Sequence, residues 1–208
     1  MLIGKEQDWI EGEERAWQIL AGLTADDVTQ RAQVGFDRLT GSYRLAFFNS
    51  EVLISPETET IQGDAGAVGF LLSRLPQYSR LSILWYLIYA KNVPLADILV
   101  NPREVNGGLI FAQGTHQFPL AEIAARYGGD SAGFQQQGRL LGAAPLDYGD
   151  AALQLFPFPR VPMVLILWQE DDEFPARSDI LFDATCSLHL PTDIIWSTAM
   201  MTLLAMLR

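Results

Sequence analysis

The segment PMVLILWQ, residues 162–169, constrains the fold most, because apolar side chains occupy both alternate sets of positions along it. A strand of this composition has two apolar faces and therefore needs a covering layer on each side, as a central strand has. The segment and the other long apolar run, ILWYLIYA at 83–90, are both well short of the ~18 residues of a membrane span. We therefore expect a layered core built around a central strand, and no membrane partner.

The rest of the chain alternates between blocks of helical and strand-like patterns. Apolar spacing and stop signals predict helices at 8–22, 25–32, 81–92, 119–129, 131–141 and 191–208, and strands at 43–48, 51–56, 59–63, 152–158, 162–169 and 178–183. We expect the Thr24 hydroxyl to cap the second helix, Asp130 or Ser131 to cap the fifth, and the glycine-rich residues 63–69 to form a loop. Blocks of this kind, without a βαβ rhythm, predict an α+β fold with a mostly antiparallel sheet and packed helices. The length of 208 residues favours a single compact domain over residues 1–208.

Charge and cysteine content exclude several classes of function. The chain has 25 acidic and 14 basic residues, a net charge of −11, and its basic residues are scattered. Binding to nucleic acid requires clustered Lys and Arg, so we expect no nucleic acid partner. One cysteine allows no internal disulfide and none of the multi-cysteine metal motifs. Because the amino terminus is rich in Glu and does not read as a secretory signal, we expect a cytoplasmic protein.

The segment DATCSLHLPTD, residues 183–193, contains the only cysteine and one of two histidines. If Asp183 caps a short helix, Cys186 lies near the helix N-terminus, where free amides favour a thiolate, and His189 lies one turn later as a base. That pair would suit acyl transfer. The competing interpretation, which we favour, is a buried, inert Cys186 and a hydrogen-bonded His189 at a structural joint.

A second candidate constellation is acidic and would hold a metal ion. Glu170 opens the acidic run EDDE after the apolar strand, and Asp183 follows the next strand. Carboxylates at strand ends can bind a hard cation, with His189 as a nitrogen ligand. The alternative is a solvated turn between two strands. The sequence identifies no cofactor.

Arg160 and His116 are the remaining candidate residues. Arg160 lies between Pro159 and Pro162 on a stiffened backbone, so its guanidinium could contact an acidic ligand or cofactor, or else pair with Glu170 or Asp172. We favour the structural pairing. We interpret His116, in GTHQFP, as a turn residue rather than a partner of His189.

The last predicted helix has only a thin polar stripe. Its apolar residues surround Ser197, Thr198 and Thr202. A helix of this composition lies deep in a core or is shared with a partner subunit, so a homodimer through residues 194–207 is possible.

Two long segments together resemble a known family. LSILWYLIYAKNVPLADILVNPREVNGGLIFAQG and PLDYGDAALQLFPFPRVPMVLILWQEDDEFPARSDILFDATCSLHLPTD are similar to an uncharacterised family of domains of unknown function. The resemblance spans nearly the whole chain and implies an origin in anaerobic bacteria and archaea, such as acetogens, sulfate reducers and methanogens. Some relatives carry an added iron–sulfur-type Cys-rich segment, which this sequence does not contain. The family assigns no activity and no catalytic residue.

Two functions from different classes follow from these observations. The first is an accessory or binding domain for a protein partner or small ligand in anaerobic metabolism. It rests on the family resemblance and on the lack of a recognisable catalytic set. The alternative is a metal-dependent or thiol enzyme centred on Asp183, Cys186 and His189.

Overall fold

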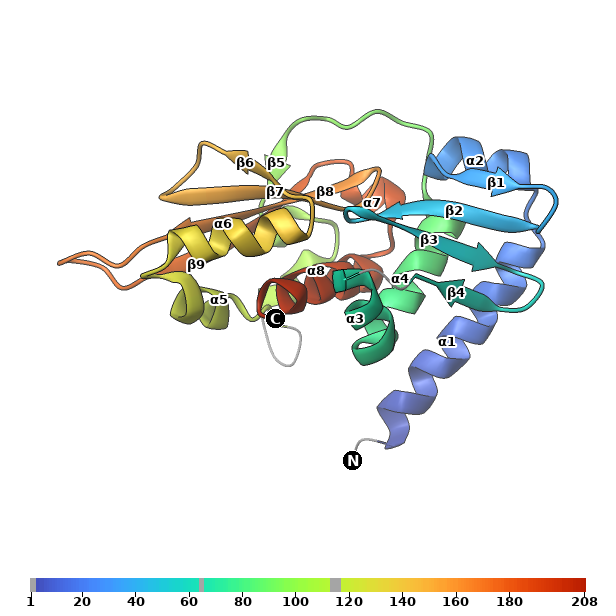
Figure 1. The fold of residues 1–208 in the computed structure, drawn as a ribbon, viewed down its shortest axis with the longest axis horizontal. Coiled ribbons are helices and arrows are strands. Elements are labelled where there is room, and N and C mark those ends of the chain that lie inside the picture. The colour runs from blue at the N-terminus through green and yellow to red at the C-terminus, as the bar shows by residue number, and fades with distance from the viewer. Residues whose placement is uncertain (1–2, 64–65, 113–116) are drawn as a thin grey trace.

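The structure is a computed structural model that describes residues 3–63, 66–112 and 117–208. Its elements in chain order are α1 (Ile3–Ala21), α2 (Ala25–Ala32), β1 (Gly35–Asp37), β2 (Ser42–Phe47), β3 (Ser50–Ser55), β4 (Thr60–Gln62), α3 (Gly66–Arg74), α4 (Pro76–Tyr89), β5 (Leu99–Val100), the short 3-10 helices η1 (Pro102–Glu104) and η2 (Gly108–Ala112), α5 (Leu120–Tyr127), α6 (Ser131–Leu140), β6 (Ala144–Leu146), β7 (Ala151–Phe158), β8 (Val161–Trp168), β9 (Arg177–Asp183), α7 (Cys186–His189) and α8 (Thr192–Met206). Helices pack against two antiparallel sheets (Figure 1), which confirms the predicted α+β class.

Each sheet is antiparallel throughout. The first has the order β1-β2-β3-β4, in which every strand pairs with its neighbour in sequence. The second has the order β5-β9-β8-β7-β6, so β8 lies in its centre. Residues 161–167 of β8 are all buried. Met163, Leu165 and Leu167 face the main core with the helices, whereas Val164 and Ile166 on the other face lie in a small cluster formed by residues of the same sheet. The predicted central position of this strand is confirmed, but among the described residues the helices belong to the hydrophobic cluster on one of its faces only.

Aromatic side chains join the two sheets to the helices. The ring of Phe47 in β2 lies 5.7 Å from that of Phe158 in β7. Phe158 also stacks on Tyr86 of α4 at 4.6 Å, and the Tyr86 hydroxyl donates a hydrogen bond to the carbonyl of Ala32, at 2.8 Å. One hydrophobic cluster consequently runs through both sheets and the helices packed against them.

Helix α8 is buried within the chain along most of its length. The hydroxyls of Thr198 and Thr202 each donate to the carbonyl one turn earlier, at 2.7 and 2.8 Å, and the Ser197 hydroxyl donates to the carbonyl of Tyr78 in α4 at 3.2 Å. The thin polar stripe is thus satisfied by partners within the chain. The apolar composition of α8 therefore needs no partner subunit, and the homodimer stays a prediction. Among the helices of the described residues, none is long and apolar enough to cross a membrane.

Two local predictions were wrong and one was confirmed. Helix α3 begins at Gly66, inside the expected loop, because Val68 and Leu71 bury an apolar face against the core and outweigh the glycines. The Thr24 side chain makes no capping hydrogen bond, although its carbonyl accepts the amide of Val28 at 3.1 Å. Asp130 does cap α6, since its carboxylate accepts the amide of Gly133 at 2.8 Å.

Candidate functional site

Asp183 lies at the end of β9, and its carboxylate accepts four hydrogen bonds. The amides of Ala96 and Asp97 donate at 3.1 and 2.8 Å, and Thr185 donates through its amide, at 2.9 Å, and its hydroxyl. Burial raises the pKa of Asp183, but these hydrogen bonds outweigh it and the pKa is lower than usual. Asp183 is not the cap of α7, which begins at Cys186 with Thr185 before it. The carboxylate instead ties the segment before β5 to the end of β9.

Cys186 and His189 are both enclosed by the core. Burial raises the pKa of the Cys186 thiol to about 12, so the thiol stays protonated. His189 is fully buried, and its Nδ1 accepts the amide of Lys91 at 3.4 Å, which places the ring proton on Nε2. Burial and the nearby Arg160 guanidinium lower the pKa of His189 to about 4. The two side chains therefore do not form an accessible nucleophile and base. His116 lies outside the described residues.

The Arg160 side chain makes three structural hydrogen bonds. It donates to the carbonyls of Arg31 and Val93, both at 2.7 Å, and to the side chain of Asn92 at 2.8 Å. The prediction of a pairing with Glu170 or Asp172 is wrong. Arg160 lies in the turn between β7 and β8, whereas those carboxylates follow the opposite end of β8. Arg160 is 7% exposed and spans three chain segments, so it does not present its charge to a ligand.

The three candidate metal ligands do not come together. Trp168 lies opposite Arg177 in the β8–β9 pair, and Glu170 lies beyond Trp168. Asp183 follows Arg177 by six residues along β9, a distance of roughly 20 Å. Glu170 is therefore at the opposite end of these strands from Asp183 and His189. Across the described ranges, no group of three or more His, Cys, Asp or Glu side chains could hold a metal ion.

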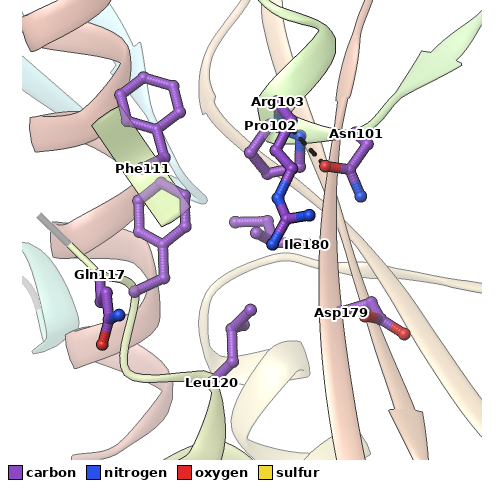
Figure 2. A pocket seen from close by; sticks show the side chains of 9 residues that line it. Asn101, Pro102, Arg103, Phe111, Gln117, Leu120, Asp179 and Ile180 are labelled. Atoms are coloured by element: carbon purple, nitrogen blue, oxygen red, sulfur yellow. Dashed lines mark hydrogen bonds between the residues drawn. The ribbon is translucent and has the colours of Figure 1, made fainter. Parts of the chain in front are cut away.

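A pocket of about 290 Å³ lies beside β9, where the short strand β5 ends (Figure 2). This volume is at the lower end of the range for small-molecule sites, which is roughly 300–1,000 Å³. The lining residues are Asn101, Pro102, Arg103, Phe111, Gln117, Phe118, Leu120, Asp179 and Ile180. The mixture of apolar walls with a few polar groups is typical of a ligand site.

The turn η1 fixes the polar side of this pocket. The Asn101 side chain accepts the amide of Arg103 at 3.0 Å, and the Glu104 carboxylate accepts the amide of Asn101 at 2.7 Å. This reciprocal pair is a capping box, and Pro102 at the first position further restricts the backbone. The sequence NPRE thus builds a rigid turn whose Arg103 side chain points into the pocket (Figure 2).

The charge of Arg103 has no neutralising partner among the residues that the structure describes. Within the described ranges, its side chain has no hydrogen bond or ion-pair partner. The only acidic residue of the pocket lining is Asp179, whose carboxylate accepts hydrogen bonds from the Trp168 indole at 3.0 Å and from Arg177 at 3.4 Å. The pocket therefore offers an unpaired guanidinium to a ligand.

The opposite wall is apolar. The rings of Phe111 and Phe118 lie 5.5 Å apart, and Phe118 also meets Phe182 of β9 edge to face at 6.4 Å. Leu120 and Ile180 complete this wall. The pocket can accordingly hold an anionic group and an apolar group of one molecule at the same time.

None of these pocket residues was predicted from the sequence as a site residue. The available signal was NPRE, in which an Asn cap, a Pro and a Glu three residues after the cap indicate a capped turn. That signal predicts the turn but not the pocket, because the lining comes from three separate segments of the chain.

Comparison with known proteins finds one family. Residues 24–205 match the family model described as a domain of unknown function, DUF3786. No curated protein and no solved structure matches the chain. Since this description contains no activity, the function has to be inferred from the geometry of the site.

Proposed function

The chain belongs to the DUF3786 family of domains of unknown function, and we propose that it binds a small carboxylate ligand in the Arg103 pocket. The observation that carries the proposal is the unpaired guanidinium of Arg103, held on a rigid turn opposite an apolar wall. A planar guanidinium suits a carboxylate because it can donate two parallel hydrogen bonds.

The chemistry of the lining favours a carboxylate over a phosphate ester. Among the lining residues that the structure describes, Arg103 is the only basic one, and Asp179 would repel a second negative charge. A singly charged group matches this balance better than a doubly charged one. Phe111 and Phe118 would contact an aliphatic or aromatic part of the ligand.

A binding role also agrees with the state of the other candidate residues. Asp183, Cys186 and His189 hold a buried joint together, so the geometry of these residues gives the thiol or metal enzyme no support. The proposal therefore keeps the accessory or binding domain as the function. We also propose that the protein acts in the cytoplasm of anaerobic organisms, on the basis of the family resemblance.

Titration of the full chain with a matched pair of compounds tests the proposal. The carboxylate 4-methylpentanoate should bind, and its primary amide, which has the same shape without the charge, should bind at least about tenfold more weakly. Equal affinity for the two compounds would show that Arg103 does not select an anion.

A further inference from the structure

One edge of β9 is open beside the pocket. Strand β5 covers this edge only at Phe182 and Asp183, which lie opposite Val100 and Leu99. Just beyond this pair, the amide of Ala184 donates to the carbonyl of Ile98 at 2.9 Å. Within the part of the chain that the structure describes, the residues of β9 before Phe182 therefore have no strand on this side.

The alternation of an antiparallel ladder shows which backbone groups point to the open edge. Residues two apart along a strand direct their N–H and C=O groups to the same side. Since Ala184 faces β5, Phe182 and Ile180 face the same side. The N–H and C=O of Ile180 are thus directed away from β8, toward the edge that the pocket occupies.

The sequence explains why β5 does not pair with Ile180. In the register of this pair, the residue opposite Ile180 would be Pro102, which has no N–H to donate and begins the turn η1. Ile180 is only 2% exposed, and within the described residues no hydrogen bond outside the sheet ladder involves its backbone. Buried peptide groups without a partner are costly, typically by about 1–3 kcal/mol each.

We infer that the ligand carries a secondary amide beside its carboxylate, as an N-acyl amino acid or the C-terminal residue of a peptide does. Its carboxylate binds Arg103, its amide N–H donates a hydrogen bond to the backbone carbonyl of Ile180, and its apolar side chain lies against Phe111 and Phe118. This is the strand-addition mode of peptide recognition, confined to one residue by the short open edge. The inference rests on the proposed function, because both use the same pocket.

A pair of isosteric ligands tests the amide directly. N-acetyl-L-leucine has the amide N–H, whereas 2-acetoxy-4-methylpentanoate replaces that N–H with an ester oxygen and keeps the carboxylate and the side chain. Calorimetric titration of the full chain should show the amide binding about tenfold more tightly than the ester. In ¹⁵N NMR spectra, the Ile180 amide signal should shift on saturation with N-acetyl-L-leucine.

The Arg103→Gln variant separates this inference from the proposed function. If the amide and the ester bind equally and both are weakened by Arg103→Gln, the carboxylate site stands and the amide inference is overturned. If Arg103→Gln leaves the affinity of both unchanged, the proposed function fails and the inference fails with it. A preference for the amide that persists at reduced affinity in Arg103→Gln supports both.

Longer ligands distinguish the two sources of this chemistry. A peptide ending in a free C-terminal leucine should bind if the natural ligand is a protein chain end. Binding of N-acetyl-L-leucine without binding of that peptide would identify a small metabolite. Equally tight binding of the C-terminally amidated peptide would overturn the inference, because that peptide lacks the carboxylate.

Discussion

Arg103 and Asp179 line the same pocket but do not form an ion pair, and the Asp179 carboxylate instead accepts hydrogen bonds from Trp168 and Arg177. The positive charge of Arg103 therefore stays available, and a carboxylate ligand would not have to displace an internal partner. Binding is less costly when no existing contact has to be broken first.

His189 should make the stability of the protein depend on pH. Burial lowers the pKa of His189 from 6.5 to about 4. Between these pH values, His189 is therefore protonated in the unfolded chain but neutral in the folded chain. As the pH falls from about 6.5 to about 4, the free energy of unfolding should decrease by roughly 3 kcal/mol from this group. Urea unfolding of wild type and His189→Gln between pH 7 and pH 4.5 measures the effect. An identical pH slope in the two proteins would contradict it.

Asp183→Asn should destabilise the fold strongly. An amide has one acceptor oxygen, and its NH₂ group would face the N–H groups of Ala96 and Asp97, so at least one buried donor loses its partner. We expect a loss of about 3 kcal/mol in the free energy of unfolding at pH 7. Asp172→Asn, at an exposed carboxylate of the turn after β8, is the matched control and should change it little. Equal effects of the two substitutions would refute the role of Asp183.

The Cys186 thiol should be unreactive in the native protein. Its pKa of about 12 leaves almost no thiolate at pH 8, and the side chain is buried. Labelling with an aromatic disulfide reagent should occur only on unfolding, and Cys186→Ala should retain full ligand affinity at a cost of about 1 kcal/mol in stability. Rapid labelling of the folded protein would revive the thiol enzyme.

The molar mass of the protein in solution tests the predicted homodimer through residues 194–207. The partly exposed apolar residues that this segment would contribute to such a contact are Trp196, Met200, Leu204 and Leu207. Light scattering should then give twice the chain mass of 23.1 kDa, and Leu204→Glu should halve it. The mass of one chain at micromolar concentration would exclude this dimer.

Much of the fold could be predicted from local patterns. The three long strands β7, β8 and β9 lie within about one residue of their predicted positions, because apolar and β-branched residues mark them clearly. Helix α3 could not be recognised, since its glycines mask an apolar face that only tertiary packing stabilises. The prediction of one domain over residues 1–208 would be supported by a single cooperative unfolding transition.

The site was harder to predict than the fold. Cys186 and His189 were candidate catalytic residues because Cys and His are rare in this chain and chemically reactive. The same residue types also occur at buried structural joints, and only the burial of these two side chains distinguishes the structural role from the catalytic one. Arg103 appeared as one of several scattered basic residues. Its importance depends on Ile180 and Phe118, which are distant in sequence and approach it only through the pairing of β5 with β9 and the packing of α5.

The most direct test of the account is the affinity of Arg103→Gln for 4-methylpentanoate. Arg103 is exposed and makes no side-chain hydrogen bond within the described residues, so the substitution should leave the unfolding temperature unchanged. Arg139→Gln, at an exposed arginine of α6, serves as the control for the loss of one positive charge. Calorimetric titration should show at least about tenfold weaker binding in Arg103→Gln and wild-type binding in Arg139→Gln. Equal affinity in all three proteins would contradict a carboxylate site at Arg103.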